Sequence, residues 1–249
     1  MSSDFPIRVP ERLPTKINPC PILEAFVELR FSANVPELTL AGLLFAQIRD
    51  QYPGQENLPT AQIPEEARKA DPNLIYLPTA RFLSNEFILQ LGPRVVGLAI
   101  PTGKYPGWAR LRTEIEFLFT CLEKAKFIQQ SERLGLRYVD FFGFDLYPHL
   151  DLQLLVGNRP FTPSELLIST LVTRNMAIAR LTISNNATAT INNQLQPGSV
   201  LDIDVWFGPK DFGLFSDAMS RLDDAHSLQK DIFFGLLKPD FLQTLNPVY

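Results

Sequence analysis

Apolar and polar side chains alternate along residues 21–31, the first segment of the chain with a regular pattern. The apolar positions on one side of the pattern are Leu23, Ala25, Val27, Leu29 and Phe31. Glu24, Glu28 and Arg30 take the other side. Because strand side chains point alternately to two faces, the pattern predicts a half-buried strand. Its apolar face needs a cover, and a helical pattern at 38–52 can supply one.

The rest of the first half predicts a hairpin, a second helix and another strand. Two short apolar runs at 87–91 and 95–100 flank Gly92-Pro93, which is typical of a hairpin. Pro106-Gly107-Trp108 opens a segment with apolar residues at helical spacing, and Arg112 and Glu116 lie four residues apart on its polar side. A strand follows from residue 134. The order is therefore strand, helix, hairpin, helix, strand.

The second half is rich in strands until its end. The predicted strands cover residues 166–173, 177–184, 187–191 and 200–207. Asn185-Asn186 favours a tight hairpin, because asparagine tolerates positive φ. A long amphipathic helix is predicted over 215–237, and Pro239 ends it. The fold class that follows is α+β, with antiparallel sheet packed against long helices.

Prolines divide the chain. Their spacing between residues 5 and 21 predicts an extended arm, so we expect an arm at 1–21 and a single domain at 22–249. A division of that domain into halves 22–145 and 160–249 stays open. The proline-rich stretch 53–78 is expected to be a long surface loop or a flexible insertion, and loops of that length are candidates for contact with a partner.

Composition narrows the class of protein. The 249 residues are 45% hydrophobic, enough for a full core, and the net charge of −4 gives no general attraction to nucleic acid or anionic membrane. The first residues hold no apolar signal region, and no stretch approaches the ~20 apolar residues of a membrane helix. We therefore expect a cytoplasmic protein. Cys20 and Cys121 lack metal-site or redox-motif spacing and are expected to be reduced structural thiols.

Common catalytic motifs are missing from the sequence. It contains no phosphate-binding loop, no dinucleotide fingerprint, no H-E-x-x-H and no G-x-S-x-G. The two histidines are His149, expected at the surface, and His226, which lies three residues after Asp223 in the final helix. Asp223 could orient His226 or share a metal with it, but a catalytic zinc needs three protein ligands. A histidine at the helix surface or at its boundary with the core, paired with an aspartate, is the simpler interpretation.

Asp202 and Asp204 form the sharpest acidic pair, because they share one face of the predicted strand 200–207. Two such carboxylates can reach one divalent ion, and with His226 they make an alternative metal site. Glu24 and Glu28 repeat the arrangement on the first strand. The competing interpretation is that both pairs lie on solvated sheet faces, with cross-strand partners supplied by Arg30, Arg137 and Arg180.

Several segments together resemble a family of bacterial proteins. They are N-P-C-P-I-L-E-A-F-V-E-L-R-F near the start, Y-P-G-W before a helix, E-R-L-G-L-R-Y-V-D at mid-chain and L-D-D-A-H-S-L-Q-K-D-I-F-F-G-L-L near the end. The chain resembles, over nearly its whole length, a sporadically distributed bacterial family of unknown function. The resemblance implies a bacterial, cytoplasmic protein and carries no catalytic residues. Sporadic distribution hints at horizontally moved systems such as toxin–antitoxin pairs or phage defence.

We expect a non-catalytic, protein-binding protein of a bacterial accessory system, of the antitoxin, immunity or phage-defence type. The candidate partner-binding residues are Glu24, Glu28, Arg30, Arg137 and Tyr138. We expect a protein partner and no cofactor, membrane or nucleic acid, and a homodimer stays open. One alternative is a small-molecule-binding module with an apolar cavity under the sheet, which the 19 phenylalanines could line. The other is a metal-dependent phosphodiester hydrolase.

Overall fold

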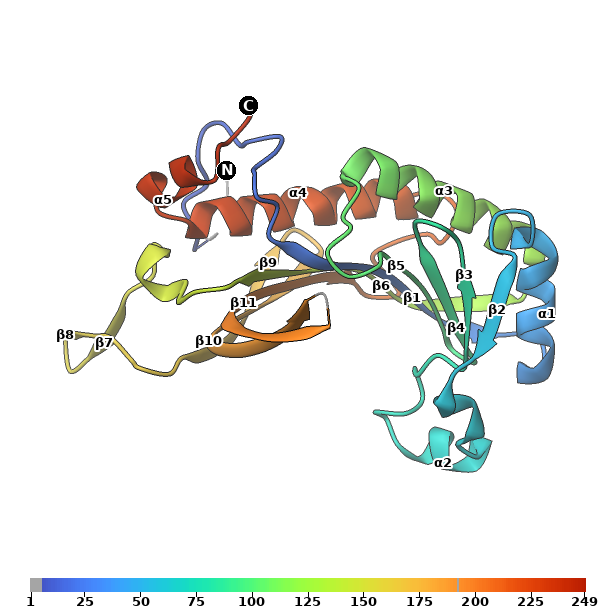
Figure 1. Cartoon of the computed structure of the whole chain (residues 1–249). Helices are drawn as coiled ribbons and strands as arrows, with labels where there is room; N and C mark the ends of the chain where they lie inside the picture. The colour runs from blue at the N-terminus through green and yellow to red at the C-terminus, as the bar shows by residue number, and fades with distance from the viewer. Residues whose placement is uncertain (1–5, 192) are drawn as a thin grey trace. The chain divides into compact units, whose positions relative to one another are not determined.

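Nine strands form one antiparallel sheet in the computed structural model, which describes residues 6–191 and 193–249 (Figure 1). The strand order is β2-β3-β4-β5-β1-β6-β11-β10-β9, and a separate hairpin pairs β7 with β8. The strands are β1 (Ile22–Ala33), β2 (Gly54–Asn57), β3 (Ala80–Leu83), β4 (Ile88–Gly92), β5 (Val95–Ala99), β6 (Ile128–Phe142), β7 (Leu154–Val156), β8 (Arg159–Phe161), β9 (Leu167–Arg174), β10 (Ala177–Ile191) and β11 (Gln194–Phe207). The predicted α+β class with antiparallel sheet and long helices is confirmed.

The helices are α1 (Glu37–Ile48), α2 (Glu65–Ala70), α3 (Trp108–Ala125), α4 (Ala218–Leu236) and α5 (Pro239–Thr244), with 3-10 turns η1 (Pro59–Gln62) and η2 (Tyr147–His149). The chain divides into two compact units, which are described separately. The α3 unit comprises Glu24–Leu136 and Trp206–Leu222. The α4 unit comprises Met1–Leu23, Arg137–Val205 and Asp223–Tyr249. These units interleave along the sequence and do not follow the halves 22–145 and 160–249.

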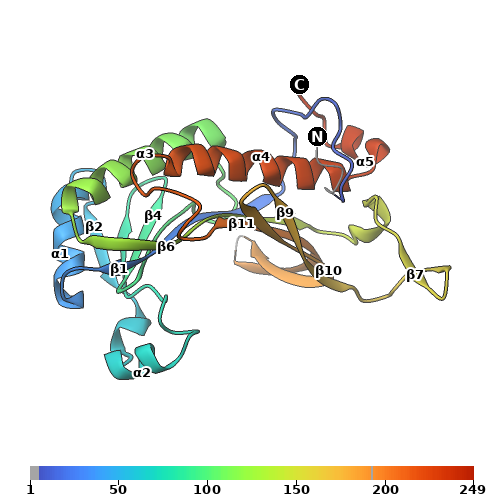
Figure 2. The same ribbon diagram turned by 180° about the vertical axis from the view of Figure 1, so that it is seen from behind.

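The core of the α3 unit lies between its strands and α3, which covers one face of them in Figures 1 and 2. The predicted alternation of β1 is confirmed, because Ala25, Val27, Leu29 and Phe31 are each at most 2% exposed. From α3, the buried side chains include Leu111, Ile115, Leu118 and Leu122. The expected hairpin is β4–β5, which pairs through Ile88↔Ala99 to Gly92↔Val95. Burial of these apolar faces is the main stabilising contribution.

The proline-rich stretch 53–78 is more ordered than the sequence predicts, since it contains β2, η1 and α2. Its prolines lie at element boundaries, where a missing N–H costs little: Pro59 begins η1 and Pro64 is the N-cap residue of α2. β2 pairs with β3 at the end of the sheet, from Gly54↔Leu83 to Asn57↔Ala80. The expectation of a long surface loop or a flexible insertion is therefore wrong for the residues that form β2, η1 and α2.

In the α4 unit, α4 lies over one face of β9, β10 and β11 (Figure 2). Leu201, Ile203 and Val205 of β11 are at most 1% exposed, as their alternation predicts. Gln229, which is 1% exposed on α4, donates from Nε2 to the Ile203 carbonyl oxygen at 2.9 Å. The predicted final helix is confirmed, and α5 follows from Pro239.

The predicted hairpin at Asn185-Asn186 is wrong, because β10 runs without a break from Ala177 to Ile191. Asn185 instead extends the pairing with the β9 side of the sheet. Its Oδ1 accepts from the Leu166 N–H at 2.7 Å, and its own N–H donates to the Leu166 carbonyl at 3.2 Å. Positive φ occurs at Asn175, between β9 and β10, and at Asn193, just before β11. Asparagine permits both a turn and a strand, and long-range pairing decided between them.

The proline-rich arm, described from residue 6, packs within the α4 unit. Lys16 forms an isolated bridge with Val248, and the Asn18 N–H donates to the Leu245 carbonyl at 2.7 Å. A Cβ placed on Gly235 of α4 would lie 2.5 Å from Ile7 Cγ2 and 2.9 Å from the Arg8 carbonyl oxygen. The arm therefore approaches the helix too closely for any residue but glycine at position 235.

No helix in the described part of the chain, α3 and α4 included, is both long enough and apolar enough to cross a bilayer. Cys20 is exposed and Cys121 buried, and neither forms a disulfide.

We expect Gly235→Ala to release the arm while leaving the helix intact. Alanine favours the helix by up to about 1 kcal/mol, but its Cβ collides with the backbone of the arm. The measurement is limited trypsin digestion followed by mass spectrometry. Cleavage after Arg8 and Arg12 should be faster than in the wild type. Gly143→Ala is the matched control, because its Cβ meets nothing within 4 Å. Equal cleavage rates in all three proteins would contradict the packing described here.

Candidate functional site

Two of the predicted partner-binding residues, Glu28 and Arg30, lie together on the face of β1 opposite its buried face. Glu28 Oε1 accepts from Arg30 Nε at 2.7 Å and from Arg133 Nη1 of β6 at 2.6 Å. Glu24, two pleats away, is exposed. The sequence predicts Arg30 as a cross-strand partner, but it pairs within its own strand, and the cross-strand partner of Glu28 is Arg133.

Around this pair, the α3 unit carries a network of arginines, glutamates and aromatic rings. The Arg30 guanidinium lies 4.3 Å from the centre of the Tyr76 ring, and that of Arg94 lies 5.4 Å from it. Tyr76 Oη donates to Glu132 Oε2 at 2.8 Å, and Arg94 Nη2 pairs with Glu132 Oε1. Sequence reasoning missed Tyr76, Arg94 and Glu132. No periodic pattern marks them, since two lie in a loop and a turn.

The other two predicted partner-binding residues, Arg137 and Tyr138, lie in the α4 unit on opposite faces of β6. Arg137 makes a two-pronged contact with Asp202, Nε to Oδ1 at 2.8 Å and Nη2 to Oδ2 at 2.7 Å. Tyr138 is 6% exposed, and its Oη lies 3.3 Å from His226 Nδ1. Tyr138 is therefore a core residue as well as a neighbour of α4, and its ring is not available as a surface contact.

The alternative metal site is not assembled. Asp202 faces Arg137, whereas His226 packs beside Tyr138, whose side chain points to the buried face of β6. Within residues 6–191 and 193–249, no group of three histidine, cysteine or acidic side chains is placed to hold a metal ion. For Asp202, the cross-strand pairing with Arg137 matches the solvated-face interpretation.

Two titratable groups of the α4 unit, the buried Asp140 and the half-buried His226, have displaced pKa values. Burial, together with the nearby Asp202 carboxylate, raises the pKa of Asp140, which is 3% exposed, to about 8. The pKa of His226 is lowered to about 4, because burial and the Lys230 ammonium lower it more than the Asp223 carboxylate raises it. At neutral pH both groups are therefore uncharged in the folded protein.

His149 is half-buried and stacks on Phe241 at 4.5 Å between ring centres.

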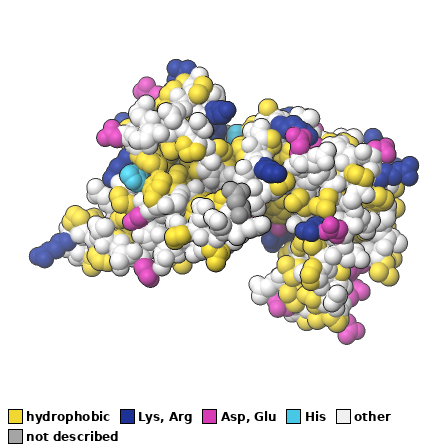
Figure 3. All heavy atoms as spheres, viewed as in Figure 1, with side chains coloured by type: hydrophobic (Ala, Val, Ile, Leu, Met, Phe, Trp, Pro, Cys, Tyr) yellow, Lys and Arg dark blue, Asp and Glu magenta, His cyan; other side chains and the backbone are white. Residues whose placement is uncertain are grey.

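The strongest unexplained surface feature of the α4 unit is the edge strand β9. It pairs with β10 from Leu167↔Ser184 to Arg174↔Ala177 and stands last in the strand order. Leu167 and Leu171 lie on the same face of β9 and are 75% and 56% exposed. The β7–β8 hairpin, which extends away from β9 and β10 in Figure 1, also exposes large apolar side chains: Leu155, Val156 and Phe161. Apolar side chains are visible on this part of the surface in Figure 3.

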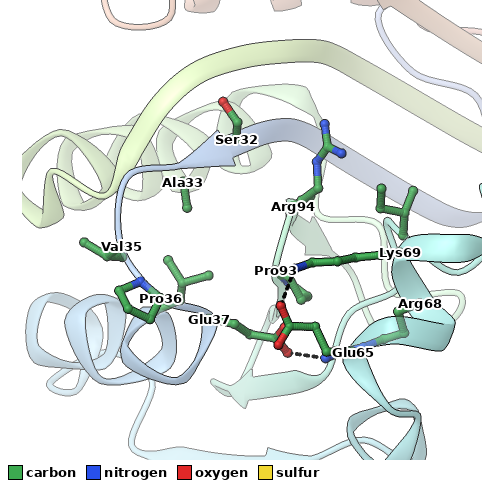
Figure 4. Close-up of a pocket in the computed structure, with 12 residues that line it drawn as sticks. Ser32, Ala33, Val35, Pro36, Glu37, Glu65, Arg68, Lys69, Pro93 and Arg94 are labelled. Atoms are coloured by element: carbon green, nitrogen blue, oxygen red, sulfur yellow. Dashed lines mark hydrogen bonds and ion pairs between the residues drawn. The ribbon is translucent and has the colours of Figure 1, made fainter.

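The α3 unit contains a charged cavity of about 520 Å³. It lies between the end of β1, the start of α1, helix α2 and the β4–β5 turn (Figure 4). Arg68, Lys69 and Glu65 come from α2, Glu37 from α1 and Arg94 from the turn. Its position and polarity differ from the apolar cavity expected under the sheet, which stays a prediction.

No family model matches the chain, and no curated protein is significantly similar to it. The resemblance to a sporadically distributed bacterial family therefore stays a prediction based on the motifs.

We expect Asp140→Asn to stabilise the protein at high pH. In the unfolded chain the aspartate ionises near pH 3.8, whereas in the folded protein its pKa is about 8. The stabilisation that the neutral carboxyl gives is complete below pH 3.8 and is lost as the pH rises through 8. The full difference is at most about 6 kcal/mol. Urea unfolding should give similar stabilities for both proteins near pH 4 and a more stable variant near pH 9. A constant difference at all pH values would refute the displaced pKa.

His226 should act in the opposite direction. Its folded pKa of about 4 lies below the unfolded value of 6.5, so the unfolded state takes up a proton first as the pH falls. The wild type should lose up to about 3 kcal/mol between pH 7 and pH 4 through this group. His226→Gln keeps a polar side chain without a titrating group and should flatten this part of the stability profile. An unchanged slope in the variant would contradict the assignment.

Proposed function

We propose that the protein is a non-catalytic binding protein that takes up an extended segment of another protein as an added strand beside β9. The observation that carries the proposal is the unprotected edge of this strand. Strand addition uses the free N–H and C=O groups of an edge for affinity and the exposed side chains for specificity. β9 offers both, with eight residues of edge and two exposed leucines on one face.

The two edge strands, β2 and β9, differ in how well their edges are protected, and this difference supports the choice of β9. β2 has the usual protection of an edge: it is four residues long, follows Pro53 and carries the exposed ion pair Glu56–Arg81 at 2.5 Å. β9 has twice the length, no proline and no charged side chain before Arg174. An edge of that kind is a hazard for aggregation unless a partner covers it. A partner strand that pairs with β9 would cover its free backbone groups, so the same edge can serve as a binding site.

The exposed side chains indicate the chemistry of the partner. Side chains directly opposite in an antiparallel pair lie on the same face, so apolar residues at alternate positions of the partner would meet Leu167 and Leu171. The β7–β8 hairpin precedes β9 in the chain and offers Val156 and Phe161 as further apolar contacts. The partner is therefore an extended, uncharged segment with alternating apolar residues.

The biological setting belongs to the same proposal. The sequence resemblance supports a bacterial accessory system of the antitoxin, immunity or phage-defence type. An antitoxin or immunity protein acts by binding another protein, which requires a binding surface and no catalytic group. The expected partner-binding role of Glu28, Arg30 and Arg137 is a secondary part of this proposal, because their side chains already have partners in the fold.

The test places a photo-crosslinking amino acid at Thr173, an exposed position of β9, in the full chain expressed in its native host. One protein should become crosslinked in stoichiometric amounts, and mass spectrometry should locate the bond in an extended apolar segment. The same amino acid at Ser227, exposed on α4, is the positional control. Leu167→Lys with Leu171→Lys should reduce the yield at Thr173 by about tenfold or more, the effect of ~1.4 kcal/mol in affinity.

Leu195→Lys is the matched substitution control, because Leu195 is 76% exposed on β11 and lies outside β9. It should leave the crosslink unchanged. A crosslink that forms equally from Thr173 and Ser227, or that survives both lysine substitutions in β9, would overturn the proposal. A bond formed only to a second copy of this chain would replace it with self-association.

A further inference from the structure

The cavity of the α3 unit has the size and lining of a small-molecule site. Its volume of about 520 Å³ falls within the range of about 300–1,000 Å³ that ligand pockets occupy. One part of its wall is apolar, from Val35, Leu40 and Ile75. The other part is charged and comes from α2, α1 and the β4–β5 turn. Figure 4 shows the charged ends of Glu37, Glu65, Arg68 and Lys69 converging between α1 and α2.

Arg68 is the most unusual group in this wall. It is 7% exposed, although it belongs to a helix of only six residues. Its Nη2 donates to Glu37 Oε1 at 2.5 Å, while its Nε and Nη1 are buried without a hydrogen-bond acceptor in the described part of the chain. Buried donors without acceptors cost free energy and are rare, so each requires an explanation. Packing does not explain them, since an apolar side chain would fill the same space.

Arg94 has the same deficiency at the other side of the cavity. Its Nη2 pairs with Glu132, but its Nε is buried and, among residues 6–191 and 193–249, has no acceptor. Two arginines that line one cavity thus have three donor nitrogens without an acceptor. Each of these three nitrogens lacks an oxygen atom that accepts its hydrogen bond.

The charges around the cavity favour an acidic acceptor. Arg68, Lys69 and Arg94 contribute three positive charges to the lining, against two negative charges from Glu37 and Glu65. The Lys69–Glu65 pair at 2.5 Å is mostly exposed on both sides and can rearrange at little cost. Guanidinium groups bind carboxylate and phosphate oxygens best, because two parallel N–H groups meet two oxygens.

The geometry points to a binding site for a small organic acid: a carboxylate or phosphate group accepts hydrogen bonds from the buried Arg68 and the partly exposed Arg94, and an apolar body contacts Val35, Leu40 and Ile75. This site lies in the α3 unit and is independent of the proposed strand addition at β9 in the α4 unit. It assigns a role to α2, whose six residues are too few for a stable helix without tertiary contacts.

The experiment titrates the full chain with benzoate and phenyl phosphate and follows the arginine Nε–H signals by ¹⁵N NMR. Inorganic phosphate and sodium chloride are the reference anions. One signal, absent in Arg68→Lys, should shift in a saturable manner with an organic acid at up to about 10 mM, and Arg68→Lys should weaken binding about tenfold or more. Tighter binding of benzoate identifies a carboxylate ligand, and tighter binding of phenyl phosphate a phosphate ligand. Either result supports the proposal.

Arg81→Lys is the matched control, because Arg81 forms an exposed ion pair with Glu56 in the same unit, and its binding should equal that of the wild type. Lys69→Met tests the cavity without touching a buried residue and should weaken binding severalfold. The proposal is overturned if neither organic acid shifts the Arg68 signal, or if Arg68→Lys and Lys69→Met bind both acids as tightly as Arg81→Lys. Equal binding of inorganic phosphate and phenyl phosphate would refute the apolar part of the site.

Discussion

A sheet that helices cover on one face obliges every strand to separate apolar from polar side chains residue by residue. In the α3 unit, β1 meets this constraint with Ala25 to Phe31 under the helix layer and Glu28 and Arg30 on the other face. In the α4 unit, β11 does the same with Leu201 and Ile203 against α4. Apolar burial stabilises one face, and the other must satisfy charges that lie close together. Two further features depend on this constraint: how the charges on the polar face are paired, and how the edge strands of the sheet are protected.

On the polar face, most charges pair within the sheet rather than remain available to partners. Glu28 accepts from two arginines, and Asp202 binds Arg137 through two hydrogen bonds. Such pairs contribute modestly to stability when they are partly exposed, but they neutralise the surface. The charged side chains that the sequence singled out as candidates on this face therefore largely pair with one another. The unsatisfied features lie elsewhere: the bare edge of β9 and the donor-rich cavity beside α2.

The edge of β9 and the cavity beside α2 could bind partners in two different ways. The outer edge of β9 has no neighbouring strand, so its backbone groups can bind only water. Its exposed leucines would gain from contact with an apolar partner. At the cavity, buried guanidinium nitrogens of Arg68 and Arg94 have no acceptor in the described part of the chain. Both combine an apolar contact with unmet hydrogen bonding, a combination that gives affinity and orientation together. They lie in different units, so a protein partner and a small ligand need not compete for the same residues.

The sequence was sufficient to predict several local elements and their buried sides: β1, the β4–β5 hairpin, α3 and α4, and with them the α+β class. These depend on periodicity, which neighbouring residues encode. It misjudged Asn185, which takes part in a continuous strand, and the segment 53–78, where prolines mark the ends of real elements. Three properties are visible only in the folded chain: β9 is an edge strand, Tyr138 is buried and Arg68 lies in a cavity wall. Those properties depend on strand order and on contacts between residues far apart in the chain, and no local pattern specifies which distant segment will cover a side chain or pair with a strand.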